Sequence, residues 1–259
     1  FDLMPGNFLR NLLIKKFMEF SIYLSEILIV PSNFAKNEIA KFLNINENKI
    51  LVVYLGIDKK YLTSDSKDFI EGFDYDKRYI LSVLSCVKYH NIINLLKAFK
   101  TLKDEVNFDL KFVLVLNILD KIYYYEVNKF IKENFNNNEI KIFTNLESKY
   151  LINLYKKSLL YLFTSYCEVF GMTTLEAMAQ KTPVIVSNKS ALPEINSNAA
   201  EYFDPDDIVE IKQKIKLIIT DKNYKKKLLN ISNDHYKKYN WKKNIDQTLW
   251  AIKKINNFK

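Results

Sequence analysis

The sequence predicts an α/β fold built on a parallel sheet. Short apolar runs recur along the chain, and they lack the alternation of polar and apolar residues that a half-exposed strand shows. Stretches with helical periodicity separate one run from the next. This strand and helix order, with strands buried on both faces, is typical of a doubly wound α/β domain.

The first part of the chain contains too few strands for a sheet of its own. We expect a helix at 8–25, a strand at 26–30, a helix at 33–43 and a strand at 49–55. Two strands cannot bury a parallel sheet, so we interpret residues 1–57 as the tail of another α/β domain whose beginning is absent. The polar stretch 58–77, which contains Gly72, is interpreted as a linker.

The second part supplies a complete sheet, and we place the main domain at 78–240. The expected strands are 78–84, 110–116, 139–143, 159–163 and 183–187, and the expected helices are 91–103, 121–135, 147–157 and one from about 174. Two or three further helices follow from residue 206. We expect the last of them, in 241–259, to pack back on the N-terminal part.

Composition narrows the function classes. The net charge of +9 would suit a nucleic acid, an anionic membrane surface or a phosphate-bearing small molecule. Cys86 and Cys167 are too few for a disulfide scaffold or a zinc site, and we interpret them as small buried thiols in a reducing, cytoplasmic setting. No apolar run reaches the roughly 18 to 20 residues that span a bilayer.

Ligands of doubly wound domains bind outside the carboxyl ends of the strands. The residues just after the expected strands therefore carry the site, and they lie at 84–90, 116–120, 144–146, 164–173 and 187–194. The stretch "CEVFGMTTLEAMAQKTPVIVSN" (167–188) covers parts of two of these five places.

Two glutamates in this stretch have competing interpretations. The run "TTLE" (173–176) fits a capping box, in which Glu176 only helps to start a helix. Glu168 could be a solvated loop charge. A strand, a turn with Gly171 and a helix N-terminus also present backbone amides to phosphate, and carboxylates on either side would accept hydrogen bonds from sugar hydroxyls. That arrangement suits a sugar nucleotide.

The stretch "TSYCEVFGMTTLEAMAQKTPVIVSNKSALPEI" (164–195) resembles the donor-binding signature of retaining GT-B glycosyltransferases of the family 4 type. Further pieces in the same order support the resemblance: "VPSNF", "VYLGID", "YHNIINLLKAF", "AEYFDPDD" and "YNWKKN". It implies two Rossmann-like domains, of which the N-terminal one is incomplete here. It also implies transfer of a sugar from a nucleotide sugar with retention of configuration, without a metal or other cofactor.

The resemblance assigns roles to individual residues. Glu176 matches the glutamate that binds the ribose hydroxyls, and Glu168 matches the one near the transferred sugar. The residues matching the turn whose amides meet the donor sugar and diphosphate are Phe170, Gly171, Met172 and Thr173. Base contacts are expected from the loop between Thr144 and Leu146.

The basic pair that relatives place after the first strand of this domain is altered. The loop reads "SCVKYHN": His90 stands where a Lys is expected, Ser85 or Cys86 lies near the place of an Arg, and Lys88 is a substitute cation. A surface histidine before a helix is the alternative interpretation of His90. Lys181 replaces the usual Gly between helix and strand, and a left-handed C-cap there would cost it about 1 kcal/mol. We interpret "DPDD" (204–207) as a turn and helix N-cap, not a metal site.

The expected function is sugar transfer to a saccharide or lipid-linked acceptor, in the synthesis of cell-surface polysaccharide or glycolipid. The alternative is a truncated, non-catalytic nucleotide-binding or partner subunit of a glycosyltransferase. The basic helix at 10–20 would allow peripheral contact with the inner face of the membrane, although such an apolar face is more often core. We interpret the basic tail 223–243 as solvated helices and expect no nucleic-acid partner.

Overall fold

A six-stranded parallel sheet organises the larger part of the molecule, in the strand order β5-β4-β3-β6-β7-β8. The computed structural model describes residues 8–62 and 66–256. Residues 1–7, 63–65 and 257–259, which fall in the expected N-terminal remnant, linker and last helix, lie outside the described residues. The strands are β3 (Tyr79–Cys86), β4 (Lys111–Ile118), β5 (Ile140–Thr144), β6 (Leu160–Phe163), β7 (Val184–Ser187) and β8 (Glu201–Phe203).

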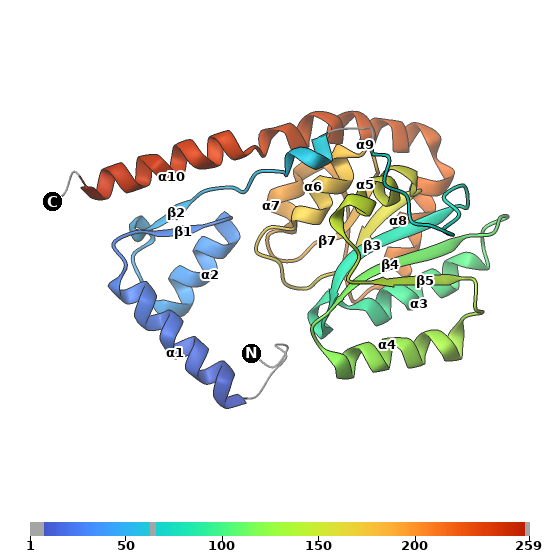
Figure 1. The fold of residues 1–259 in the computed structure, drawn as a ribbon, viewed down its shortest axis with the longest axis horizontal. Coiled ribbons are helices and arrows are strands. Elements are labelled where there is room, and N and C mark those ends of the chain that lie inside the picture. Colours follow the sequence, from blue (N-terminus) through green and yellow to red (C-terminus); the bar gives the residue numbers. More distant parts are fainter. Residues whose placement is uncertain (1–7, 63–65, 257–259) are drawn as a thin grey trace.

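Strand order reverses between β3 and β6. The chain adds β4 and β5 on one side of β3, then returns to place β6, β7 and β8 on the other. This is the order of a doubly wound α/β domain, so the predicted fold class is confirmed. After β3 the chain continues into α3 (Ile92–Lys103) on one face of the sheet, and after β6 it continues into α6 (Met172–Ala179) on the other face (Figure 1).

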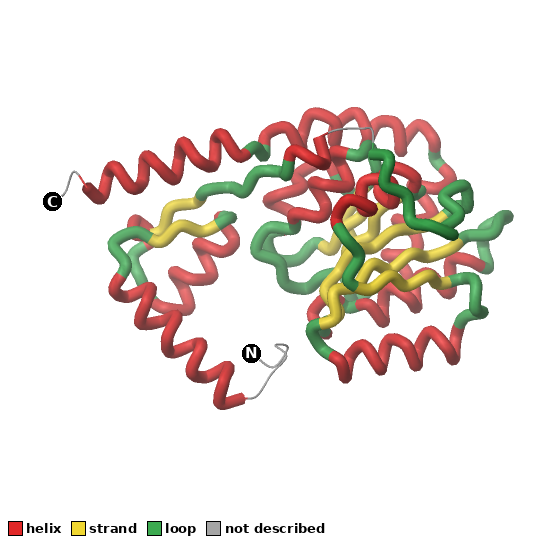
Figure 2. Tube along the Cα trace, in the orientation of Figure 1, coloured by secondary structure: helices red, strands yellow, loops and turns green. Residues whose placement is uncertain are grey.

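Helices cover both faces of the sheet. They are α3 (Ile92–Lys103), α4 (Lys121–Asn134), α5 (Ser148–Lys157), α6 (Met172–Ala179), α7 (Leu192–Asn196), α8 (Ile208–Thr220) and α9 (Lys222–His235). In the view of Figure 1, α3 and α4 lie below the sheet, and α5 and α6 lie above it. Figure 2 shows the same layers as helices on either side of the strands.

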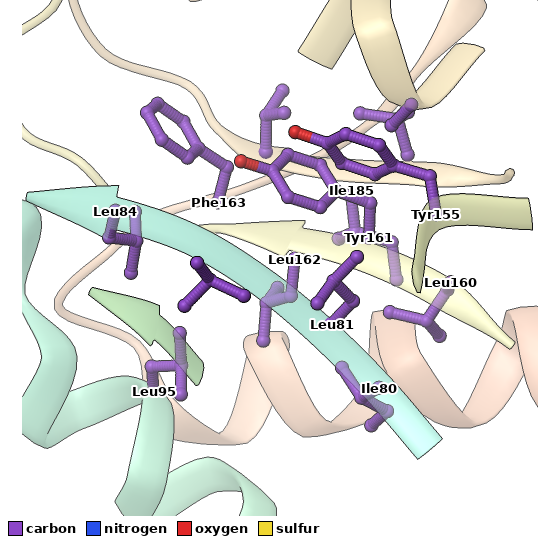
Figure 3. Packing of buried hydrophobic residues seen from close by; sticks show 14 of the residues in the cluster. Ile80, Leu81, Leu84, Leu95, Tyr155, Leu160, Tyr161, Leu162, Phe163 and Ile185 are labelled. Atoms are coloured by element: carbon purple, nitrogen blue, oxygen red, sulfur yellow. The ribbon is translucent and has the colours of Figure 1, made fainter. Parts of the chain in front are cut away.

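The core explains why the strands read as apolar runs. Every residue of β6 and β7 is buried, as expected for strands covered on both faces. Figure 3 shows Ile80 and Leu81 of β3 beside the residues of β6, with the rings of Tyr155 and Tyr161 next to each other. Their phenol oxygens reach toward the carboxyl end of the sheet, where they meet side chains of α6.

A smaller parallel pair, β1 (Leu28–Val30) with β2 (Ile50–Val52), lies in the N-terminal part. Together with α2 (Asn33–Leu43) it forms its own small core, made of Val30, Ala35, Ala40 and Ile50. The helix α1 (Phe8–Leu24) leaves most of its large apolar side chains exposed, for example 70% of Leu13 and 73% of Phe17. The interpretation of this helix as core is therefore wrong within the described residues, because a two-stranded sheet and one helix cannot cover it.

The last helix, α10 (Trp241–Asn256), extends from the large sheet back over the N-terminal part (Figure 1). Gly56 permits this crossing, because a Cβ there would lie 2.3 Å from the backbone nitrogen of Trp241. Asn244 Nδ2 also donates to the carbonyl of Tyr54 at 2.8 Å. The two parts of the molecule are thus joined by backbone packing as well as by the chain.

Several local predictions can be compared directly with the structure. Lys181 has a φ of 59°, so the left-handed C-cap is confirmed. Asp207 caps α8 by accepting from the amide of Glu210, which confirms the N-cap in "DPDD". The sequence reading missed β8 and α7, which have three and five residues and are too short to show a period.

Candidate functional site

A cavity of about 540 Å³ opens at the carboxyl ends of the strands, at the reversal between β3 and β6. Such a switch point is where doubly wound domains bind ligands. The lining residues come from the ends of β3, β4, β5 and β6 with the loops that follow them, from α5 and from the start of α6: Val83, Leu84, Ser85, His90, Val115, Leu116, Asn117, Asn145, Leu146, Leu151, Phe163, Glu168, Gly171, Met172 and Thr173.

Seven of the sequence-predicted site residues line this cavity, although most are far apart in the chain: Ser85, His90, Leu146, Glu168, Gly171, Met172 and Thr173. The other four do not line it. Lys88 is exposed beside the cavity on a 3-10 turn, and Thr144 ends β5. Phe170 is buried, and Glu176 lies one helical turn behind Thr173.

The turn between β6 and α6 presents a helix N-terminus to the cavity. Gly171 precedes α6 with a φ of 88°, a left-handed conformation that a side chain rarely adopts. A Cβ there would also lie 2.7 Å from Leu192 Cδ2. Because the first amides of a helix lack intrahelical partners and carry partial positive charge, this turn can hold an anion such as a diphosphate.

The capping box proposed for residues 173–176 does not form. Thr173 lies inside α6, and its Oγ1 accepts from the Tyr161 hydroxyl at 2.8 Å. Glu176 Oε2 accepts from the Tyr155 hydroxyl at 3.1 Å. The helix starts two residues earlier than a capping box requires, because Gly171 and not Thr173 is its N-cap. Glu176 therefore has no local role in starting the helix.

The carboxyl group of Glu176 is largely shielded from water. Burial raises its pKa to about 7, while the hydrogen bond from Tyr155 and the charge of Lys60 act in the opposite direction. The tyrosine itself is fully buried, and burial raises its pKa well above the ordinary value. A carboxyl group kept here costs stability at neutral pH, which points to a use other than holding the fold.

His90 and Glu168 form a contact pair at the mouth of the cavity. His90 Nε2 lies 3.0 Å from Glu168 Oε1, and the exposed fractions of the two side chains are 7% and 19%. His90 Nδ1 lies 2.6 Å from the carbonyl of Ser85. A carbonyl only accepts, so Nδ1 carries a proton, and the contact with Glu168 needs a second proton between Nε2 and Oε1. His90 is therefore not a surface histidine.

Phe170 anchors the turn from behind. Its ring packs against Tyr54 and Tyr239, with centroid distances of 6.4 and 5.6 Å. The two thiols beside the site differ from each other: Cys86 is buried, but Cys167 is exposed. The interpretation of both as buried thiols is wrong for Cys167, because the loop that follows β6 leaves the sheet before this residue.

Two exposed carboxamides, Asn117 and Asn145, also line the cavity. Asn145 lies in the loop near Thr144 to Leu146 from which base contacts are expected, whereas Asn117 was not among the predicted site residues. Asn117 lies near the end of β4 and Asn145 directly follows β5, and the two strands are paired up to Leu116 and Thr144. Both fall in the ranges that strand ends single out, but only the sheet register shows that they face the same cavity. Asn145 has a φ of 53°, which turns the loop at this point.

The described residues contain neither a metal-binding cluster nor a membrane-spanning helix. Among residues 8–62 and 66–256, no group of three or more His, Cys, Asp or Glu side chains could hold a metal ion. Across the same described ranges, no helix has the length and apolarity needed to cross a bilayer.

Comparison with known proteins identifies relatives of this chain. A family model described as "Glycosyl transferases group 1" matches residues 63–238. The O-antigen chain mannosyltransferase RfbU of Salmonella typhimurium is 27% identical over 215 residues, which are 78% of this chain and 54% of the relative. The chain therefore spans about half the length of that curated relative.

Solved structures show the same fold. A glycosyltransferase from Rickettsia africae superposes with a TM-score of 0.77 at 23% identity, covering 89% of this chain and 63% of that one. HepE of Anabaena, solved in complex with UDP and glucose, gives a TM-score of 0.73 at 15% identity, covering 88% and 63%. These matches place the architecture in the GT-B fold.

The raised pKa of Glu176 predicts a pH-dependent stability difference. An acid whose folded pKa is raised contributes stability that is present below its unfolded pKa of 4.5 and is lost as the pH rises through about 7. Glu176→Gln should therefore gain stability over the parent chain as the pH rises from 5 to 8, by about 3 kcal/mol. Urea unfolding at several pH values measures this gain.

Glu71 provides the control for this measurement, because it is exposed on a turn. Glu71→Gln should change stability by less than about 0.5 kcal/mol at every pH. A Glu176→Gln difference that stays constant between pH 5 and 8 would show that the carboxyl group is not desolvated.

Proposed function

The chain belongs to the glycosyl transferases group 1 family, and on that premise we propose that it transfers a sugar from a nucleoside diphosphate sugar to an acceptor hydroxyl, with retention of configuration. The observation that carries this proposal is the cavity at the switch point. There, a helix N-terminus at Gly171 and the His90–Glu168 pair face the same space.

The turn and the pair suit the departure of a diphosphate. Negative charge grows on the leaving oxygen as the bond to the anomeric carbon breaks, and amides at the start of α6 would stabilise that charge without a metal. A proton held between His90 and Glu168 would reinforce them. The acceptor oxygen forms the new bond on the same face of the sugar, and its proton passes to the released phosphate.

Glu168 and Glu176 receive different roles. Glu168 lines the cavity and would accept a hydrogen bond from a hydroxyl of the transferred sugar. Glu176 lies behind Thr173 on the same helix and would meet the ribose hydroxyls. Their different depths agree with these roles, because the sugar must leave with the product while the ribose remains with the nucleotide. Asn145 and Leu146, which line the cavity after β5, would contact the base.

The names of three relatives suggest which sugar is transferred and in which biosynthetic process. RfbU and two further relatives are named mannosyltransferases, and two of these three act on the O-antigen chain according to their names. We therefore propose a mannosyl donor, a saccharide or lipid-linked acceptor, a role in cell-surface polysaccharide synthesis, and a cytoplasmic site of action. A nucleotide-binding partner subunit is the second candidate.

Calorimetric titration with UDP and with GDP tests donor binding directly. We expect heat of binding with one of them, and a weaker affinity in Glu176→Gln than in the parent chain. Transfer of radiolabelled mannose by the chain alone then separates the enzyme from the partner subunit. Heat with neither nucleotide, while the fold is intact by circular dichroism, would contradict the proposal.

Substitution of His90 and Lys88 separates the two candidate cations. His90 contacts Glu168, whereas Lys88 is exposed and does not line the cavity. We expect His90→Asn to lower kcat by about a hundredfold, a loss typical of a group that stabilises developing charge. Lys88→Ala should lower it less than about threefold by the same criterion. A larger loss in Lys88→Ala than in His90→Asn would transfer the role to Lys88.

A further inference from the structure

Glu194 connects the two parts of the molecule through four hydrogen bonds. Its Oε1 accepts from the backbone nitrogen of Asn33 at 2.8 Å, from Asn33 Nδ2 at 2.9 Å and from the Tyr54 hydroxyl at 2.9 Å. Its Oε2 accepts from the backbone nitrogen of Phe34 at 2.9 Å. The carboxylate belongs to α7 of the large sheet domain, and all the donors belong to the N-terminal part.

The position of this carboxylate is electrostatically favourable. Asn33 and Phe34 are the first two residues of α2, an eleven-residue helix. Helix N-termini attract negative charge through unpaired amides and the helix dipole. Ser32 already caps the amide of Ala35, so Glu194 accepts from the amides that the local cap leaves over. The large domain thus supplies the anion that this helix terminus favours.

The segment that carries Glu194 also supports the candidate site. Ser190 Oγ accepts from the amide of Glu168 at 2.8 Å, and the amide of Ala191 donates to the Glu168 carbonyl at 3.2 Å. Leu192 lies against Gly171 closely enough to exclude a Cβ there. Residues 190–194 therefore hold the backbone of Glu168 at one end and the start of α2 at the other.

A second set of contacts links the same two regions through Tyr54. Tyr54 donates a hydrogen bond to Glu194, and its ring also packs against Phe170 in the turn between β6 and α6. Burial raises the pKa of Tyr54 to about 12, with the Glu194 carboxylate as the next cause, so the phenol stays protonated and keeps donating. The start of α2 and the turn next to Glu168 are thus linked on two sides.

We infer that Glu194 is a positioning residue for the transfer reaction: it fixes the N-terminal part, on which the acceptor would lie, relative to the turn that carries Glu168. This rests on the proposed function. Transfer requires the acceptor oxygen to approach the donor sugar within a narrow range, and a displacement of about 1 Å can cost a hundredfold in rate. Glu194 contacts neither the cavity nor its lining residues through its carboxylate, so donor affinity does not depend on it.

Steady-state kinetics and calorimetry on Glu194→Ala and Glu194→Gln test the inference. In Glu194→Ala, we expect kcat to fall at least tenfold while the Kd for UDP or GDP changes less than twofold. In Glu194→Gln, one amide oxygen still accepts from α2, so kcat should recover to within about fivefold of the parent. Glu38→Gln is the matched control, because Glu38 is an exposed residue of α2 itself.

Hydrogen exchange at the amides of Asn33 and Phe34 gives a readout that does not need turnover. In the parent chain, the hydrogen bonds to Glu194 should keep exchange at both amides slow, with or without UDP or GDP. In Glu194→Ala these amides should exchange fast with or without nucleotide, while residues 168–176 are still protected by it.

The outcomes of these experiments distinguish failure of the positioning role from failure of the proposed function. An unchanged kcat in Glu194→Ala would overturn the positioning role. A fall in kcat accompanied by an equal fall in nucleotide affinity would also overturn it. If the parent chain binds nucleotide without turnover, the exchange at Asn33 and Phe34 decides instead, and equally slow exchange at these amides in Glu194→Ala would overturn the positioning role. If the parent binds neither nucleotide, the proposed function fails, and the positioning role fails with it.

Discussion

The reversal of strand order between β3 and β6 is the constraint on which the rest of this molecule depends. It sends the helices that follow β3 and β6 to opposite faces of the sheet, and a cavity opens at the carboxyl ends of these strands. His90 comes from the loop after β3 and Glu168 from the loop after β6, so their contact exists only because these strands are neighbours. Gly171 then starts α6 at the same end of the sheet, which brings a helix N-terminus to the cavity.

Two carboxylates, Glu176 and Glu194, have opposite electrostatic effects on the stability of the fold. Glu176 lies next to buried tyrosines with its pKa raised to about 7, so its ionisation is unfavourable in the free protein. Glu194 is placed against a helix terminus and four donors, which favour its negative charge. A ligand that donates hydrogen bonds to Glu176 would replace lost hydration, and this is the property expected of a binding carboxylate.

Much of the fold follows from local patterns, because parallel strands buried on both faces appear as apolar runs. The strands from 79 to 187 and most helices lie within a few residues of their predicted bounds. The short elements β8 and α7 could not be predicted, since three to five residues show no period. The capping box was a wrong alternative because Thr173 and Glu176 bond to Tyr161 and Tyr155, two partners that only tertiary structure provides. Asn117 and Glu194 were missed for the same reason.

A crystal structure of this chain with a nucleoside diphosphate bound is the most direct test of whether the cavity at the switch point binds the donor. We expect the diphosphate within hydrogen-bonding distance of the backbone amides of residues 171–173, close to His90, with the base toward Asn145 and Leu146. A nucleotide bound outside the cavity between β3 and β6, or one whose diphosphate lies away from this turn, would contradict this expectation.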